Sequence, residues 1–198
     1  MSDEILHWSM VTSVEPTEEP VSLVEARAQC AIDSTEFDDQ LSGWIKAARQ
    51  LIEADAATAL MSQTRVLRMD RFPCEQIEIP CSEVTAVSSI VYTAMDGTAT
   101  TWSSDQYVAD IYSLPARVKV KFGYAWPVTL PQLNAVAVTF TAGKSTAASV
   151  SQIARQAILL LVAEWWKNRE ETTANKLSDA TASAYYRLVQ RLKWGSYP

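Results

Sequence analysis

The sequence contains very little histidine and cysteine, which excludes several kinds of active site. Its 198 residues include one histidine, His7, in a leader that we expect to be mobile. A zinc site of the usual kind needs several cysteine and histidine ligands, and a catalytic triad needs a rigidly held base. The cysteines Cys30, Cys74 and Cys81 are odd in number and lack paired motif spacing, so we predict free, buried thiols in a reducing compartment. The sequence therefore argues against a zinc enzyme and against a histidine-dependent hydrolase.

A long apolar run and a basic N-terminus are also missing. A membrane-spanning helix needs about 20 consecutive apolar residues. The longest strongly apolar run, residues 157–163, has seven and belongs to a longer amphipathic pattern. The first residues, MSDEILHWSM, are acidic and predict neither a secretory signal nor a transit peptide. We expect synthesis in the cytoplasm and no association with a membrane.

Charge is unevenly distributed along the chain, although the total is only −6. Residues 1–20 contribute −5, residues 21–58 contribute −4, residues 59–150 sum to zero and residues 151–198 carry +3. No part has the concentrated basic face that reads duplex DNA. The basic C-terminal part is therefore expected to form a solvated helix face or to meet an acidic partner.

The patterns that are present predict an α+β fold, a small helical bundle of about four helices with an inserted antiparallel β subdomain. Hydrophobic residues make up 48% and charged residues 20%, which is an ordinary globular balance. Five parts follow one another along the chain. They are an extended N-terminal arm at 1–20, N-terminal helices of the bundle at 21–60, the β subdomain at 61–143, C-terminal helices at 150–193 and a tail at 194–198.

Two helices are expected near the N-terminus. Ser22 and Glu25 have the spacing of a capping box, which predicts a short helix over roughly 22–31. A second helix over 36–55 has one apolar stripe at three-and-four spacing, which we interpret mainly as core packing. The stripe consists of Phe37, Leu41, Trp44, Ile45, Ala48, Leu51 and Ile52.

The middle of the chain, from about residue 62 to residue 142, predicts six or seven short antiparallel strands. Its runs are rich in valine, isoleucine, threonine and tyrosine, and turn signals separate them. Asp96 and Gly97 predict a hairpin, because both residues tolerate a positive φ. Trp102 and Trp126, which lie near expected strand ends, are candidates for an exposed aromatic platform.

Helical periodicity returns at the C-terminus. A helix over 151–170 has a very broad apolar face, which indicates burial against more than one neighbour, within the subunit or across an interface. In the last helix, Tyr185, Leu188 and Leu192 share one side, and Gly195 is a natural stop.

Residues 143–146, Gly-Lys-Ser-Thr, look like the start of a phosphate-binding loop. A Walker loop requires a glycine five positions earlier, where this chain has Val138, and its helix begins at the lysine. Here the helix is expected to begin near Ser149 or Ser151, and the sheet is expected to be antiparallel. We therefore predict a turn, with no nucleotide or other cofactor, no metal and no catalytic residues.

Four segments together resemble the head–tail connector proteins of tailed bacteriophages, also called adaptor or head-completion proteins, which gene transfer agents also carry. The segments read VSLVEARAQCAI…DDQLSGWIKAARQLIEADAATAL, QTRVLRMDRFP, AVAVTFTAG and IARQAILLLVAEWWKNREE, and they span roughly residues 21–171 in the family's order. The strongest signatures are Phe72-Pro73, closing the first strand, and the helix at 155–170. The chain departs from the family where Ala56-Ala57-Thr58 replaces a common glycine and where Lys144 replaces an aromatic residue.

The resemblance implies a structural virion protein that is not an enzyme. Family members form a ring, usually of twelve copies, which docks beneath the portal protein at the capsid vertex. The ring extends the DNA channel and offers a platform for a stopper or tail protein, and DNA passes through without being read. The implied location is the neck of the virion, after synthesis in the host cytoplasm.

Two surfaces are expected to carry the contacts of such a ring. Subunit contacts are assigned to the outer faces of the helices at 36–55 and 151–170, with Trp44, Trp165 and Trp166 either there or in the core. Portal binding is assigned to the C-terminal segment, although this segment could instead pack on its own subunit. The portal-binding residues are Arg187, Arg191, Leu192, Trp194 and Tyr197.

Two alternatives stay open at this stage. The first is another neck component, such as a stopper or tail terminator, although those proteins are mostly β. The second is a binding module whose β subdomain presents Trp102 and Trp126 to a glycan or a protein.

Overall fold

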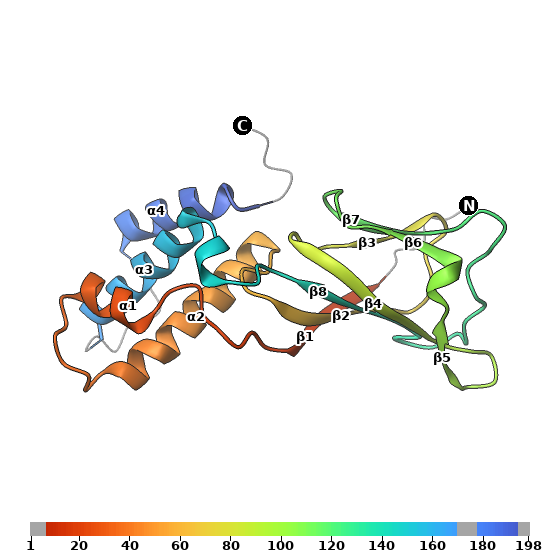
Figure 1. The fold of residues 1–198 in the computed structure, drawn as a ribbon, viewed down its shortest axis with the longest axis horizontal. Coiled ribbons are helices and arrows are strands. Elements are labelled where there is room, and N and C mark those ends of the chain that lie inside the picture. Colours follow the sequence, from red (N-terminus) through yellow and green to blue (C-terminus); the bar gives the residue numbers. More distant parts are fainter. Residues whose placement is uncertain (1–6, 170–177, 194–198) are drawn as a thin grey trace. The chain divides into compact units, whose positions relative to one another are not determined.

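The chain folds into two compact units, each described here by itself. The structure is a computed structural model that describes residues 7–169 and 178–193. The β unit comprises Met1–Glu15 and Ser62–Gly143, and the helical unit comprises Pro16–Met61 and Lys144–Pro198. Helices and antiparallel sheets are both present, so the predicted α+β class is confirmed (Figure 1).

The helical unit contains four α-helices in the described residues, as the sequence predicts. They are α1 (Leu23–Cys30), α2 (Asp38–Ala56), α3 (Gln152–Lys167) and α4 (Asp179–Gln190), with a short 3₁₀ turn at Ala147–Ser149. Each of α1, α2 and α4 packs against α3. Along the described chain, no helix combines the length and apolar character that crossing a membrane requires.

Helix α1 begins with the predicted capping box. The backbone amide of Glu25 donates to Ser22 Oγ at 3.3 Å, and the amide of Ser22 donates to Glu25 Oε2 at 2.9 Å. Two amides that the helix cannot satisfy internally thus have partners. The helix ends at Ala31, whose left-handed φ of 55° stops the helical path.

The broad apolar face of α3 is covered inside its own unit. Its fully buried residues lie in the core cluster that α1, α2 and α4 complete, and Leu159 and Leu160 are partly buried against the same cluster. Of the two kinds of neighbour left open by the sequence, neighbours within the subunit account for this burial. The buried residues are Ala154, Ala157, Ile158, Leu161 and Val162.

The β unit consists of two antiparallel sheets. The five-stranded sheet has the order β1-β2-β8-β4-β5 and the three-stranded sheet has the order β3-β7-β6. Seven of these strands fall between residues 62 and 142, in agreement with the six or seven predicted. The strands are β1 (Trp8–Val14), β2 (Gln63–Met69), β3 (Gln76–Ile79), β4 (Val84–Thr93), β5 (Ala99–Trp102), β6 (Tyr107–Asp110), β7 (Ala116–Val120) and β8 (Val136–Ala142).

The predicted N-terminal arm contains a strand of this unit. Strand β1 pairs with β2 in register from Trp8 opposite Met69 to Val14 opposite Thr64. The pairing satisfies backbone groups along β2 that would otherwise face solvent at the sheet edge. The idea of a mobile leader is therefore wrong for residues 8–14, and the β unit is more than an insertion between helices.

The hairpin between β4 and β5 forms where the sequence predicts it, but with a different turn. Only Gly97 has a positive φ, 83°, whereas Asp96 does not. The Asp96 carboxylate instead accepts from the backbone amide of Thr98 at 2.9 Å and from its hydroxyl at 2.7 Å. These bonds lower the pKa of Asp96, because they favour its charged form. The aspartate thus stabilises the turn through its side chain.

Candidate interaction surfaces

The loop at residues 143–146 is a turn, as predicted. Its first two amides are used by the protein itself, because Gly143 donates to the carbonyl of Glu83 at 2.8 Å and Lys144 donates to the carbonyl of Leu60 at 3.1 Å. Helix α3 begins only at Gln152, where the Ser151 hydroxyl accepts from the amide of Ile153 at 3.2 Å. The loop therefore lacks the array of free amides ahead of a helix that holds a phosphate.

The cysteines are free, but one of them is not buried. Cys81 is buried, Cys30 is partly buried and Cys74 is exposed, so the prediction of buried thiols is wrong for Cys74. Burial raises the pKa of the Cys30 thiol. Among residues 7–169 and 178–193, no three histidine, cysteine or acidic side chains gather as ligands for a metal ion.

Trp44 and Trp166, two residues assigned to a subunit interface, meet in a small aromatic cluster of the helical unit. Their rings lie edge to face at 6.4 Å, and Phe37 lies edge to face with Trp166 at 5.0 Å. The guanidinium of Arg169 lies over the Trp166 ring, 4.3 Å from its centre. Trp165 packs against the core cluster, and all three tryptophans are only partly buried. Their remaining surface is free for a further contact, and a subunit interface here stays a prediction.

One side of α4 is anchored to its own unit. The hydroxyl of Tyr185 donates to the Asp55 carboxylate at 2.7 Å. Glu164 accepts from the amide of Ser178 at 2.9 Å and from the hydroxyl of Thr181 at 2.9 Å. These bonds lower the pKa of Glu164, led by the amide of Ser178. Helix α4 is thus positioned on α2 and α3 at its beginning and at its middle.

The residues that the sequence assigns to portal binding begin in α4 with Arg187 and continue beyond the end of this helix. Arg187 and Arg191 are exposed, while Leu192 is partly buried against the core cluster. Trp194 and Tyr197 lie outside the described residues. The helix therefore packs on its own subunit and still presents two arginines to solvent, which is compatible with both roles considered for it.

The prediction that Trp102 belongs to an exposed aromatic platform in the β unit is wrong. This side chain is only 4% exposed, and its ring lies 5.7 Å from Phe72, 5.1 Å from Tyr107 and 5.1 Å from Trp126. Its indole N–H donates to Gln106 Oε1 at 2.5 Å. Trp126 is itself partly buried and stacks on Phe72 at 4.9 Å. The two tryptophans form a small core, and Phe72 of the Phe-Pro signature belongs to that core.

Exposed apolar side chains are concentrated in the β unit, which the sequence analysis did not predict. Eleven of the fourteen large hydrophobic side chains that are exposed in the described chain belong to this unit. Isolated exposed apolar residues are common, but a concentration of them often marks a contact surface. The eleven are Trp8, Val11, Val14, Met95, Val108, Tyr112, Leu114, Phe122, Tyr124, Val128 and Leu133.

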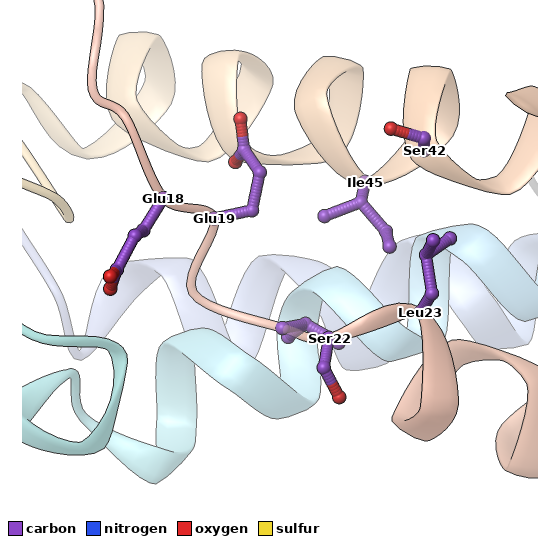
Figure 2. A pocket seen from close by; sticks show the side chains of 7 residues that line it. Glu18, Glu19, Ser22, Leu23, Ser42 and Ile45 are labelled. Atoms are coloured by element: carbon purple, nitrogen blue, oxygen red, sulfur yellow. The ribbon is translucent and has the colours of Figure 1, made fainter.

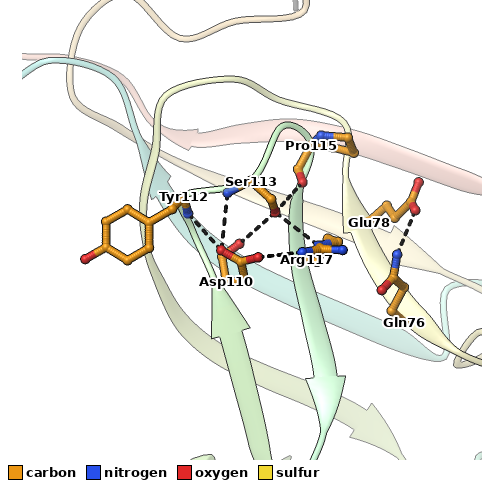
Figure 3. A network of polar contacts seen from close by, with 7 residues as sticks. All are labelled: Gln76, Glu78, Asp110, Tyr112, Ser113, Pro115 and Arg117. Carbon is orange, nitrogen blue, oxygen red and sulfur yellow. Dashed lines mark hydrogen bonds and ion pairs between the residues drawn. The ribbon is translucent and has the colours of Figure 1, made fainter. Parts of the chain in front are cut away.

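The tip of the β6–β7 hairpin presents Tyr112, one of these residues, from a turn held by several hydrogen bonds (Figure 3). Asp110 Oδ1 accepts from the amides of Tyr112 and Ser113 at 3.1 and 3.2 Å, while Oδ2 pairs with Arg117 at 2.7 Å. The Ser113 hydroxyl donates to the carbonyl of Pro115 at 2.8 Å. The Arg117 bond, followed by the amide bonds, lowers the pKa of Asp110. The Tyr112 side chain is 94% exposed and points away from this network.

A pocket of about 320 Å³ lies in the helical unit between α2 and the segment that leads into α1 (Figure 2). Its lining combines two glutamates and two serines with three apolar residues. This lining includes no histidine, lysine or cysteine. The lining residues are Glu18, Glu19, Val21, Ser22, Leu23, Ser42 and Ile45.

Comparison with known proteins finds similarity at the level of the fold. No family model and no curated protein matches this sequence. A chain in the virion of a native gene transfer agent particle is 18% identical, with a TM-score of 0.73 over 96% of this chain and 97% of that chain. A chain in the neck of an empty particle, computed with C6 symmetry, is 22% identical, with a TM-score of 0.71 over 97% of this chain and all of the other. A chain in the neck of a native particle, computed with C12 symmetry, is 21% identical, with a TM-score of 0.68 over 97% and 100%. Over nearly its whole length, this protein therefore has the fold of chains found in gene transfer agent particles and their necks.

Proposed function

We propose that this protein is a structural component of the neck of a phage-like particle, where it acts as the head–tail connector. The observation that carries the proposal is the likeness to neck chains over 97% of this chain and the full length of each of those chains. A fold alone does not define a function. Here the fold agrees with the order of sequence segments that resembles the connector family, and the loop at 143–146 lacks the geometry of a nucleotide site.

The proposed assembly is a ring of twelve copies around the DNA channel. Necks that contain chains of this fold were computed with C12 and with C6 symmetry, and twelve copies are compatible with both. A ring requires two unlike patches on each copy, which meet head to tail and close after a fixed number of steps. We propose that the partly buried residues Trp44, Trp165 and Trp166 belong to one patch.

The exposed apolar surface of the β unit supports an assembled state. Monomeric proteins rarely expose large contiguous apolar areas. Tyr112 and Leu114 at the hairpin tip, and Phe122 and Val128 in the following loop, are all exposed. We propose that neck proteins cover these side chains in the particle. Replacing both Tyr112 and Phe122 with serine should leave the fold unchanged and reduce incorporation into particles.

Portal binding is proposed for the exposed side of α4 and the segment that follows it. Arginine and aromatic residues contribute strongly to interface energy, and Arg187 and Arg191 are already exposed. Ending the chain at Gln190 should abolish binding to the portal protein while preserving the thermal unfolding of the remainder. Replacing Arg187 and Arg191 with glutamine should weaken binding, whereas glutamine at Arg68, an exposed arginine of the β unit, is the matched control. Unchanged portal binding by the truncated chain would contradict this assignment.

DNA is proposed to pass through the ring without being read. The net charge of −6 provides no general attraction to phosphate, and weak binding limited to low salt is expected. A gel-shift experiment with unrelated duplexes tests this, because tight or sequence-selective binding is incompatible with a passive channel.

The alternative functions are less well supported. Another neck component, such as a stopper or tail terminator, agrees with the neck likeness but not with the four helices. A binding module built on Trp102 and Trp126 is disfavoured because Trp102 is buried among other aromatic rings. Electron microscopy of a particle neck distinguishes all three, since the connector position lies directly below the portal.

A further inference from the structure

The chain passes three times between its two units, and these passages converge on one buried side chain. The passages follow Glu15, Met61 and Gly143, where the chain leaves one unit and enters the other. On the helical side, the first passage continues through residues 16–21. The second comes from Leu60 and Met61, and the third enters at Lys144.

The first passage is held by a buried ionic pair on α2. Arg49 and Glu53 lie one helical turn apart, their side chains are 1% and 5% exposed, and Arg49 Nη1 lies 2.9 Å from Glu53 Oε2. The same guanidinium reaches the first passage, because Arg49 Nε lies 2.8 Å from Glu19 Oε2. One arginine thus bridges a carboxylate of α2 and a carboxylate of the incoming chain.

The second and third passages are held through the other oxygen of Glu53. Glu53 Oε1 accepts from the backbone amide of Leu60 at 2.8 Å. The carbonyl of Leu60 then accepts from the amide of Lys144 at 3.1 Å, and Met61 and Lys144 form an isolated parallel bridge. The chain of bonds therefore runs from Glu19 through Arg49 and Glu53 to Leu60 and Lys144.

Burial makes this arrangement cooperative. A charge that is nearly excluded from water is stable only while its partners stay in place, and losing one partner leaves the other charge uncompensated. Glu53 contacts both Arg49 and the amide of Leu60, and it therefore joins the two branches of the chain of bonds.

We propose that Glu53 is a positioning residue that links the three passages within the helical unit. Because of this link, the contacts that hold the three passages break together. This inference does not depend on the proposed role in a neck. It assigns a conformational role to an ionic pair whose four-residue spacing in the sequence looks like that of an ordinary surface pair. Glu19 lies at the end of one branch, so its loss releases only the first passage.

Residue-resolved hydrogen exchange by NMR on the full chain tests the proposal. Glu53→Gln should accelerate exchange of the Leu60 and Lys144 amides together, by about tenfold or more, since a hydrogen bond to a charged group is lost. It should also shift the methyl signals of Val21, whose side chain is buried at the end of the first passage. Glu19→Gln should shift the Val21 methyl signals and leave the exchange of the Leu60 and Lys144 amides unchanged. The control, Glu25→Gln, removes the ion pair to Arg155 in the same unit and should leave Leu60 and Lys144 unchanged.

A milder variant keeps the proposal testable if Glu53→Gln does not fold. Glu53→Asp keeps the charge and shortens the side chain by one methylene, so it should accelerate Leu60 and Lys144 together with a smaller amplitude. The proposal is overturned if either Glu53 variant accelerates Leu60 while Lys144 keeps its protection. It is equally overturned if Glu19→Gln accelerates exchange of the Leu60 and Lys144 amides.

Discussion

The two units of this protein differ in how many large apolar side chains they expose. In the described part of the helical unit, only Val24, Leu51 and Tyr186 are large, hydrophobic and exposed, although α3 is the most apolar of the described helices. The β unit exposes eleven such side chains, several of them in the hairpin tip and loop between β6 and β8. The broad apolar face of α3 therefore reflects the three helices that pack around it. In the described β unit, seven of the eleven exposed side chains lie in the connections between strands.

The largest expected effect contrasts a buried and an exposed phenylalanine of the β unit. Phe140 lies on the central strand β8 and is fully buried, so Phe140→Ala should lower the free energy of unfolding by about 3–5 kcal/mol. Phe122→Ala, the same change at an exposed position, should alter it by less than about 0.5 kcal/mol. Urea unfolding of both variants measures this difference. Equal destabilisation would mean that the loop around Phe122 belongs to the core.

The next prediction tests whether the core of the helical unit is fully packed in the unassembled chain. Leu161 of α3 is fully buried inside the unit, so Leu161→Ala should cost about 2–5 kcal/mol in the purified, unassembled chain. The control is Leu51→Ala at an exposed position of α2, where a much smaller change is expected. If Leu161→Ala were neutral in isolation and harmful only in particles, the α3 face would require a neighbouring copy.

A smaller effect concerns the attachment of α4. Tyr185→Phe removes the bond to Asp55 and should cost about 1 kcal/mol near neutral pH. Burial, and then the hydrogen bond to Asp55, raise the pKa of Tyr185 well above its usual 10. A raised folded-state pKa contributes stability below pH 10, and this stability is lost as the pH rises further. Urea midpoints between pH 8 and 11 should therefore fall more steeply for the wild type than for Tyr185→Phe. Parallel curves would show that Tyr185 is not buried as described.

The smallest effect concerns the start of α1. Ser22→Ala removes the N-cap and should cost about 1 kcal/mol at pH 7. Bonds from Ser22, led by its backbone amide, and the nearby Arg155 lower the pKa of Glu25. A lowered folded-state pKa gives stability above the usual 4.5, which disappears as the pH falls. The difference between wild type and variant in thermal unfolding should therefore narrow below about pH 4. A difference that is constant from pH 7 to pH 3 would exclude the contribution of Glu25.

Local patterns were sufficient to predict the helices. The capping box at Ser22 and the stripe on α2 lie within single segments, and helix periodicity does not depend on distant partners. The strands from 63 to 142 were equally visible as alternating runs. The α+β class, and a turn in place of a phosphate-binding loop at 143–146, were likewise predicted from patterns within single segments.

Long-range pairing could not be predicted in this way. Strand β1 is separated by about fifty residues from β2, and its sequence resembles an exposed tail because only one edge is paired. Trp102 was expected to be exposed because it lies near a strand end. Its burial depends on Phe72, Tyr107 and Trp126, which come from separate segments. Arg49 and Glu53 match a solvated helix pair, and only the tertiary fold shows that they are buried.

The position of β1 far ahead of its partner strand β2 also affects how the protein is made. Residues 8–14 leave the ribosome well before residues 63–69, with which they pair. At translation rates of about 5–20 residues per second, this strand waits roughly 3–10 s for its partner. During this delay α1 and α2 can already form, while Trp8 and Val11 have no strand beside them. Until β2 is made, strand β1 therefore has an unpaired backbone and exposed apolar side chains that other chains could contact.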